Sequence, residues 1–182
     1  MPDQGRLVLV VGPSGVGKDT LIDAARALGL EVCAFPRREV TRAPELGGED
    51  YVSVSDEAFD RRQAEGGYAL SWRAHGLGYG VPADIADLLA AGRTVVANVS
   101  RAVIEEARRR YANLVVVSVT ADPDLLRARL RARGRESEAE IEARVARAAV
   151  FKVEGDDVFE LPNDGAREDA VQAFVGLLTP TA

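Results

Sequence analysis

The sequence predicts an α/β fold, in which a parallel five-stranded β-sheet is wrapped by helices. Two observations support this prediction. Short apolar runs rich in β-branched residues alternate with helical patterns along most of the chain, as in β-α-β units. A glycine-rich loop at residues 12–17 also separates the first such run from the first helical pattern. The 182 residues, of which 47% are hydrophobic and 29% charged, fit one domain with a substantial core.

The elements are expected in the following order. The core strands are predicted at residues 7–11, 32–35, 94–99, 114–119 and 157–161. The most β-rich of these runs, 114–119, should be central. Helices are predicted at residues 21–28, 82–91, 101–111, 123–132, from about 137, and at 166–178. The polar stretch 37–50 is expected to be a loop. Residues 51–81 contain three strand-like pieces and a helix capped by Ser55, which indicates a small, largely antiparallel insertion.

Composition limits the possible partners and compartment. A net charge of −6 disfavours general nucleic-acid binding, because a phosphate backbone is held mainly by Lys and Arg. The single cysteine, Cys33, excludes a disulfide framework within one chain and suits a reducing interior. No signal peptide or membrane-spanning run is evident, so we expect a cytoplasmic protein without a membrane partner.

The glycine-rich loop has the spacing of a phosphate-binding loop. Its residues are Gly12, Pro13, Ser14, Gly15, Val16, Gly17 and Lys18. Such a loop points backbone N–H groups at phosphate oxygens, and its lysine reaches the β- and γ-phosphates. A tight strand-to-helix turn is the structural alternative. The motif therefore predicts that ATP binds at residues 12–20.

The residue after Lys18 departs from the motif, because Asp19 stands where a Ser or Thr normally binds Mg²⁺. A carboxylate can hold Mg²⁺ directly or through water. We therefore expect Asp19 and Thr20 to be the metal-binding residues.

Arginines gather in two further regions, and each allows two interpretations. Those between 127 and 147 either form a solvated face paired with glutamates or belong to a lid that closes over the triphosphate near Gly134. The first interpretation suits Arg127 and Arg131, and the second points to Arg133, Arg144 and Arg135. The loop 37–50 could bind a second anion, although Arg37 and Arg38 could equally be surface residues.

His75, the one histidine, is expected to be a turn residue rather than a proton shuttle. A single histidine also excludes a multi-histidine metal site within the chain. No Ser-His-Asp or paired-carboxylate spacing is present.

Several motifs together resemble the guanylate kinase superfamily over nearly the whole chain. They are the phosphate-binding loop, Val40-Thr41-Arg42-Ala43-Pro44, Gly48-Glu49-Asp50-Tyr51, the run from Leu70 to Gly80, the run from Leu126 to Arg135, and Asn163-Asp164. The resemblance implies a P-loop fold and ATP-dependent transfer to a phosphorylated acceptor. It also implies catalysis by Lys18, Arg133 and Arg144, contacts of Arg42, Tyr51 and Tyr79 with the acceptor's phosphate, and a contact of Asn163 with adenine.

The chain also departs from guanylate kinases. Glu45 replaces an arginine, Ser71 replaces the glutamate that reads guanine, Val81-Pro82 replaces a hydroxyl pair, and Asn98 replaces a strand aspartate. Guanine presents N–H donors that need a carboxylate, which Ser71 and Asn98 lack. We also hypothesise that the carboxylate missing at Asn98 has been exchanged for the one gained at Asp19.

The remaining pattern resembles the ribose bisphosphate kinases of this superfamily. It includes Gly17-Lys18-Asp19, Leu70-Ser71-Trp72, Asn98-Val99-Ser100-Arg101, residues 133–136 and residues 163–165. The likeness implies conversion of ribose 1,5-bisphosphate and ATP to 5-phospho-α-D-ribosyl 1-diphosphate and ADP, a step of phosphonate breakdown. Ser71, Asn98, Ser100 and Arg101 are then candidates for sugar binding, and Ser100 and Arg101 for the sugar's other phosphate. A guanylate kinase with an altered pocket and a non-catalytic interaction module remain alternatives.

We therefore expect a single domain over residues 1–182 with three parts. These are a core (6–35, 82–132 and 153–182), an acceptor-binding insertion (36–81) and a lid (133–152).

Overall fold

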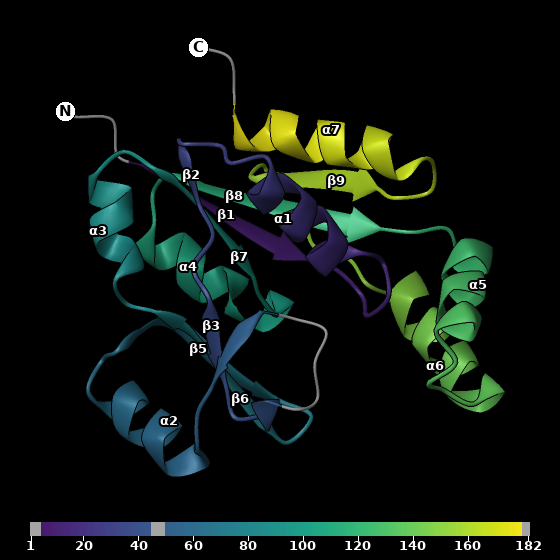
Figure 1. Ribbon diagram of the computed structural model, residues 1–182, viewed down its shortest axis with the longest axis horizontal. Helices are drawn as coiled ribbons and strands as arrows, with labels where there is room; N and C mark the ends of the chain where they lie inside the picture. Colours follow the sequence, from purple (N-terminus) through teal and green to yellow (C-terminus); the bar gives the residue numbers. More distant parts are fainter. Residues whose placement is uncertain (1–4, 45–49, 180–182) are drawn as a thin grey trace.

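The computed structural model describes residues 5–44 and 50–179 and contains two β-sheets (Figure 1). The larger sheet has five parallel strands in the order β2-β7-β1-β8-β9. Their bounds are β1 Arg6–Val11, β2 Cys33–Ala34, β7 Thr94–Asn98, β8 Leu114–Thr120 and β9 Val158–Pro162. The parallel five-stranded sheet of the predicted α/β fold is therefore confirmed.

Helices cover both faces of this sheet. On one face, α1 (Lys18–Ala27) and α7 (Arg167–Leu178) pack against each other and against Val8 and Val10 of β1. On the other face, α3 (Ile85–Ala90) and α4 (Ile104–Arg110) cover Leu7, Leu9 and Val11. Successive strand residues point to opposite faces. Both faces of β1 are therefore apolar, which produces the continuous apolar run in the sequence.

Phe174 of α7 is fully buried in the core between α7, α1 and the sheet. We expect Phe174→Ala to lower the free energy of unfolding by about 3–5 kcal/mol, because a buried aromatic ring is replaced by a cavity. Urea denaturation followed by circular dichroism measures the change. The control is Gln172→Ala on the exposed side of the same helix, which should change stability by less than about 0.5 kcal/mol. Equal effects of both substitutions would contradict this description of the core.

A second, mixed sheet lies below the larger one in Figure 1, with strand order β4-β3-β6-β5. Its strands are β3 Arg38–Val40, β4 Tyr51–Ser53, β5 Tyr68–Ala74 and β6 Leu77–Pro82, and α2 is Asp56–Ala64. The β3-β4 pair is parallel, whereas β6 is antiparallel to both β3 and β5. The hydroxyl of Ser55 accepts a hydrogen bond from the Ala58 N–H, which confirms the predicted helix cap.

A helical pair, α5 (Pro123–Arg133) and α6 (Glu138–Ala149), lies at the right of Figure 1. Asp122 caps α5, and Gly134 ends it with a φ of 66°. Ser137 and Glu140 form a capping box that starts α6. The predicted break at Gly134 and restart near Ser137 are therefore confirmed. None of the described helices is both long and apolar enough to cross a membrane.

Four sequence predictions were wrong in detail. Residues 38–40, predicted as loop, form β3, because Val40 is buried and pairs with both neighbouring strands. Pro82 ends β6 rather than starting a helix, and α3 begins at Ile85. The helix predicted from Arg101 begins with a 3-10 turn (Arg101–Val103). The middle strand is β1 rather than β8, which lies beside it.

Cys33 lies in β2 and is buried, as predicted. Glu45 and the Gly48-Glu49 part of the fourth motif lie outside the described residues.

Candidate active site

The phosphate-binding loop connects β1 to α1, as predicted. Gly12 and Gly17 have φ values of 153° and 96°, which L side chains rarely adopt. A Cβ atom at Gly12 would lie 2.5 Å from the carbonyl oxygen of Val119. The loop geometry therefore requires glycine at these positions.

Lys18 is the first residue of α1, and its side chain folds back over the loop. Its Nζ donates hydrogen bonds to the carbonyl oxygens of Gly12 (2.6 Å) and Pro13 (3.0 Å). The ammonium group is thus held beside the loop at the positive end of the helix. This arrangement can bind the phosphates of a nucleotide.

Asn163, which follows β9, contacts the same loop through a hydrogen bond. Its side-chain Nδ2 donates to the carbonyl oxygen of Val16 (2.8 Å), and the residue is 8% exposed. The backbone carbonyl oxygen of Asn163 accepts a hydrogen bond from Arg129 Nη2 (2.7 Å). The sequence pattern did not reveal this bracing contact, and the predicted contact of Asn163 with adenine stays a prediction.

The helical pair reaches the phosphate loop through Arg144. Its Nη1 donates to the Ser14 hydroxyl (2.6 Å), and its Nη2 lies 3.3 Å from Glu136 Oε1. Arg133 binds the same Glu136 oxygen at 2.6 Å. The Glu136 side chain is only 7% exposed, so two guanidinium groups share one nearly buried carboxylate beside the loop.

Arg127 and Arg131, by contrast, belong to a solvated face of the helical pair. Arg127 lies 2.5 Å from Glu142, and Arg131 lies 2.7 Å from Glu138. Hydrogen bonds from these arginines lower the pKa values of both glutamates, so the pairs stay charged at neutral pH. Arg135 is exposed and forms no ion pair with any described residue.

Arg42, Tyr51 and Tyr79 lie close together at the second sheet, and their predicted contact with the acceptor's phosphate stays a prediction. The Arg42 guanidinium lies 5.5 Å from the centre of the Tyr51 ring, and its Nη2 donates to the Tyr79 hydroxyl at 3.5 Å. The Tyr51 hydroxyl donates to the Ala43 carbonyl oxygen (2.8 Å). The cluster combines one cation with two hydroxyl groups, which suits an anionic ligand.

Arg38, whose role the sequence left open, is a buried cation. It is 8% exposed and lies over the rings of Trp72 (5.6 Å) and Tyr79 (5.4 Å). Its Nη1 donates to the backbone oxygen of Asn98 (2.8 Å), which ties the second sheet to the larger one. Arg37, by contrast, is exposed and pairs with Asp50 at 2.7 Å.

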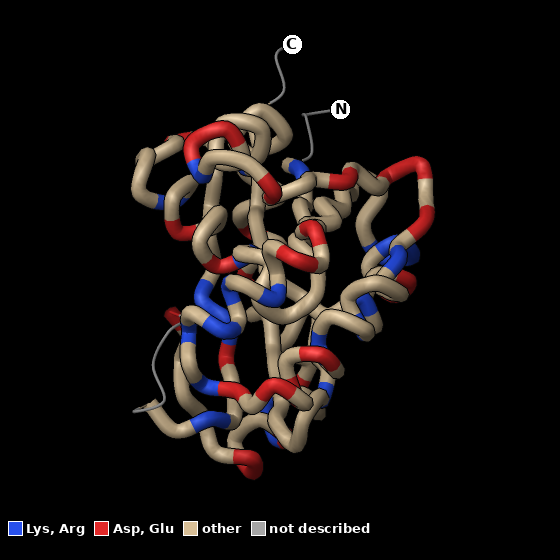
Figure 2. Tube along the Cα trace, turned by 90° about the vertical axis from the view of Figure 1, so that its right-hand side faces the viewer, with Lys and Arg blue, Asp and Glu red and all other residues tan. Residues whose placement is uncertain are grey.

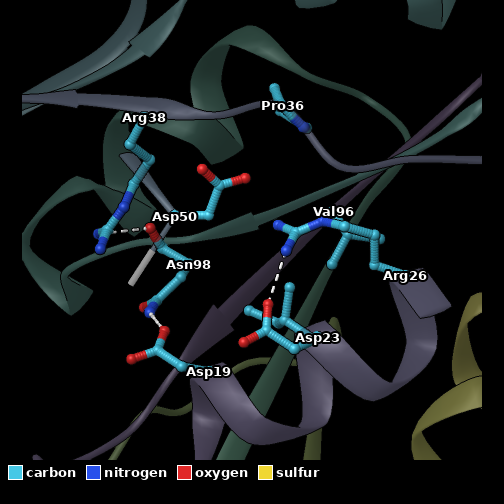
Figure 3. A pocket seen from close by; sticks show the side chains of 9 residues that line it. Asp19, Asp23, Arg26, Pro36, Arg38, Asp50, Val96 and Asn98 are labelled. Atoms are coloured by element: carbon cyan, nitrogen blue, oxygen red, sulfur yellow. Dashed lines mark hydrogen bonds and ion pairs between the residues drawn. The ribbon is translucent and has the colours of Figure 1, made fainter. Parts of the chain in front are cut away.

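Asp19 and Asn98 meet in the pocket shown in Figure 3, between α1, β7 and the second sheet. The Asn98 Nδ2 donates to Asp19 Oδ1 at 2.7 Å. Among the described residues, no three His, Cys, Asp or Glu side chains form a metal-binding group. A magnesium ion needs only one or two carboxylates when phosphates and water supply its other ligands. The Asp19 carboxylate, at the start of α1, therefore fits such an ion.

The largest cavity at this site, of about 620 Å³, joins the phosphate loop, the second sheet and the helical pair. It is lined by Pro13, Ser14, Arg42, His75, Leu77, Tyr79, Arg101, Arg144, Arg147, Val150 and Phe151. The described part of the lining contains four arginines and no carboxylate, although the whole chain has a net charge of −6. In Figure 2, several basic positions lie where the part with the larger sheet meets the part with the second sheet. The cavity therefore suits anionic ligands.

Comparison with known proteins gives a consistent result. The chain is 54% identical to ribose 1,5-bisphosphate phosphokinase PhnN of Acidiphilium cryptum, over 98% of this chain and 94% of that protein. It is 47% identical to the PhnN protein of Pseudomonas paraeruginosa, over 96% of this chain and 95% of the relative. The chain belongs to the ribose 1,5-bisphosphate phosphokinase family.

Two further comparisons concern the fold of this kinase family. Residues 8–148 match the family model of the AAA domain. A crystal structure of guanylate kinase from Anaplasma phagocytophilum superposes with a TM-score of 0.68 at 19% identity, covering 97% of this chain and 85% of that one. The likeness confirms the guanylate-kinase-like fold that the motifs predicted.

The structure also shows the surroundings of the other residues named from the sequence. The Ser71 hydroxyl accepts from Gln63 Nε2 (3.0 Å), and the Ser100 hydroxyl caps the 3-10 turn by accepting from the Ala102 N–H (3.2 Å). Thr20 is exposed on α1. His75 has a φ of 51°, which fits the predicted turn, and it also lines the large cavity.

Proposed function

We propose that the protein transfers the γ-phosphate of ATP to the 1-phosphate of ribose 1,5-bisphosphate. The products are 5-phospho-α-D-ribosyl 1-diphosphate and ADP. One observation carries the proposal: a single cavity, whose described lining residues include no carboxylate, joins the phosphate loop to arginines from three other parts of the chain. Membership of the family named for this reaction agrees with it.

Each group of residues at the site has a role in this proposal. The loop amides of residues 12–17 and Lys18 hold the triphosphate, and the loop that begins at Asn163 borders the adenine. Arg42, with Tyr51 and Tyr79, holds the 1-phosphate, while Ser100 and Arg101 face the 5-phosphate. Residues 133–152 act as a lid, from which Arg133 and Arg144 neutralise charge that develops on the transferred group.

The reaction needs no general base. A phosphate monoester is already anionic at pH 7, so its oxygen can attack the γ-phosphorus without losing a proton. The cavity lining accordingly contains arginines and hydroxyl groups, and its one histidine is a turn residue. Alignment and charge neutralisation then supply nearly all of the catalysis.

Among residues 5–44 and 50–179, the acceptor half of the site has no unpaired carboxylate that could recognise guanine. Ser71 is bonded to Gln63, and Asn98 to Asp19. The buried carboxylate of Glu39 is occupied by Arg62 and the Tyr68 hydroxyl. These contacts disfavour a guanylate kinase, and the placement of Lys18 and Arg144 disfavours a non-catalytic module.

The direct test is to assay ribose 1,5-bisphosphate and GMP side by side with ATP and Mg²⁺. We expect 5-phospho-α-D-ribosyl 1-diphosphate from the first and little GDP from the second. Equal transfer to GMP would contradict the proposed acceptor. If ATP failed to bind in a calorimetric titration, the catalytic proposal itself would be rejected.

We further propose that Asp19 and Thr20 would hold Mg²⁺, which would offset the negative charge of the triphosphate. We expect Asp19→Ser to raise the Mg²⁺ concentration needed for half-maximal rate by about tenfold or more, because a charged ligand is lost. Asp23→Ser is the matched control, since Asp23 lines the same pocket but pairs with Arg26 at 2.6 Å. The same Mg²⁺ dependence in both variants would reject a metal role for Asp19.

A further inference from the structure

Arg147 has no role in the proposed reaction, although it lines the same cavity as Arg144. The two residues are three positions apart on α6, so they lie on the same side of the helix. Arg144 points to Ser14 of the phosphate loop, with which it is hydrogen-bonded. Arg147 is therefore presented to the cavity about one helical turn beyond the phosphate loop.

The charge environment of Arg147 differs from that of its neighbours. Within the helical pair and its connection, Arg127, Arg131, Arg133 and Arg144 each bind a glutamate. Arg147 forms no ion pair with any described residue, and it is exposed. Its charge is thus available to a ligand, whereas those of the other four are partly neutralised.

Arg101 lines the same cavity from another element, the 3-10 turn Arg101–Val103. Its guanidinium lies 4.9 Å from the centre of the Phe151 ring. Phe151 lies two residues beyond the end of α6, and its N–H donates a hydrogen bond to the Ala148 carbonyl oxygen at 3.1 Å. The aromatic face thus holds Arg101 next to the end of α6 that carries Arg147. Arg101, too, forms no ion pair within residues 5–44 and 50–179.

We propose that Arg101 and Arg147 form a second phosphate subsite, which binds the 5-phosphate of the acceptor and selects a bisphosphate over a monophosphate. Phe151 is the positioning residue for Arg101. This inference rests on the proposed function, and it adds Arg147 and Phe151 to the site. A phosphate monoester carries about −1.5 to −2 charges at pH 7, which two guanidinium groups neutralise with paired hydrogen bonds.

The cavity contains the two cationic groups that such an acceptor requires. Arg42 with Tyr51 and Tyr79 forms one group at the second sheet, and Arg101 with Arg147 forms the other. Arginines of both groups line a single volume of about 620 Å³, within the range that accommodates small ligands. A ribose with phosphates at its 1 and 5 positions therefore has a cationic group available for each phosphate.

The test compares two acceptors that differ only in the distal phosphate, ribose 1,5-bisphosphate and ribose 1-phosphate. For Arg147→Ala and Arg101→Ala, we expect kcat/KM for the bisphosphate to fall by about 10- to 100-fold, as for loss of a charged hydrogen-bonding partner. The rate with ribose 1-phosphate and the KM for ATP should not change. Phe151→Leu should cause a smaller loss, again with the bisphosphate alone.

Arg109→Ala is the matched control, because Arg109 is an exposed arginine on α4 that does not line the cavity. It should leave both rates unchanged. An equal loss with both acceptors would place Arg147 in ATP binding or phosphoryl transfer and overturn the inference. Unaltered discrimination in Arg147→Ala, or a wild type that does not discriminate, would overturn it as well.

Failure of the proposed function would be recognised separately, since the wild type would then phosphorylate neither acceptor. The subsite is in that case tested by calorimetric titration with ribose 5-phosphate, which carries only the distal phosphate. Weaker binding by Arg147→Ala than by the wild type and Arg109→Ala supports the subsite. Equal affinity in all three rejects it.

Discussion

Lys18→Met is expected to lower kcat by about 10²- to 10³-fold while leaving the fold intact. The Lys18 ammonium already lies beside the loop, bonded to the carbonyl oxygens of Gly12 and Pro13 at 2.6 and 3.0 Å. It can exchange these contacts for β- and γ-phosphate oxygens without a large movement. Methionine keeps the length and apolar stem but removes the charge, and the loss of one donor to a developing negative charge costs about 10²- to 10³-fold. Initial rates of ADP formation measure the effect.

The chain offers a matched control for this substitution, because Lys152 is its only other lysine. Lys152 is exposed and pairs with Glu154 at 2.6 Å. Lys152→Met should therefore retain wild-type activity. If Lys18→Met also retained activity to within about tenfold, the loop would not hold the transferred phosphate, and the proposed mechanism would fail.

The parts of the fold that could be predicted are those determined by local chemistry. Asp122 before Pro123, Gly134 after α5, and Ser137 with Glu140 each satisfy nearby backbone groups, and the structure has all of these caps. The strand β3 could not be predicted in this way. Arg38 and Glu39 are charged, yet they are buried because Asn98, Arg62 and Tyr68 from distant segments bind them. A charged strand stabilised by tertiary contacts does not differ from a loop in its sequence pattern.

In the site, too, the features that depend on local sequence could be predicted, whereas those that depend on contacts between distant residues could not. The phosphate loop was predicted because its geometry depends on glycines within one short segment. The contact between Asp19 and Asn98 joins residues 79 positions apart, and only the resemblance linked the two positions. The structure shows that they touch, which is compatible with an exchange of the carboxylate between them. The packing of α5 against α6 also decides which arginines between 127 and 147 pair with glutamates. The sequence therefore could not identify Arg147 as an arginine without a glutamate partner among the described residues.

The second large effect is expected from Arg144→Ala, which should lower kcat by about 10³-fold with a smaller change in the KM for ATP. Of the arginines on the helical pair, Arg144 is the one with a described contact to the phosphate loop, at 2.6 Å from the Ser14 hydroxyl. An arginine that stabilises charge on a transferring phosphoryl group contributes about 10³- to 10⁵-fold. Arg144→Lys should recover only part of the rate, because an ammonium group cannot replace the guanidinium fork that binds Ser14 and Glu136 together.

Arg131→Ala provides the comparison, since Arg131 belongs to the same helical pair but binds Glu138 on the solvated face. It should leave kcat nearly unchanged, and equal losses in the two variants would reduce the role of Arg144 to stabilising the helices.

Glu136→Gln removes the negative charge of Glu136 and keeps the size of its side chain. Its carboxylate holds both Arg133 and Arg144 and is 7% exposed, so the neutral variant frees two cations beside the loop. We expect kcat to fall, because both guanidinium groups lose their fixed orientation. We also expect tighter binding of ADP, because the local positive charge increases. A parallel loss of kcat and ADP affinity would instead show that Glu136 acts only by supporting the fold of the pair.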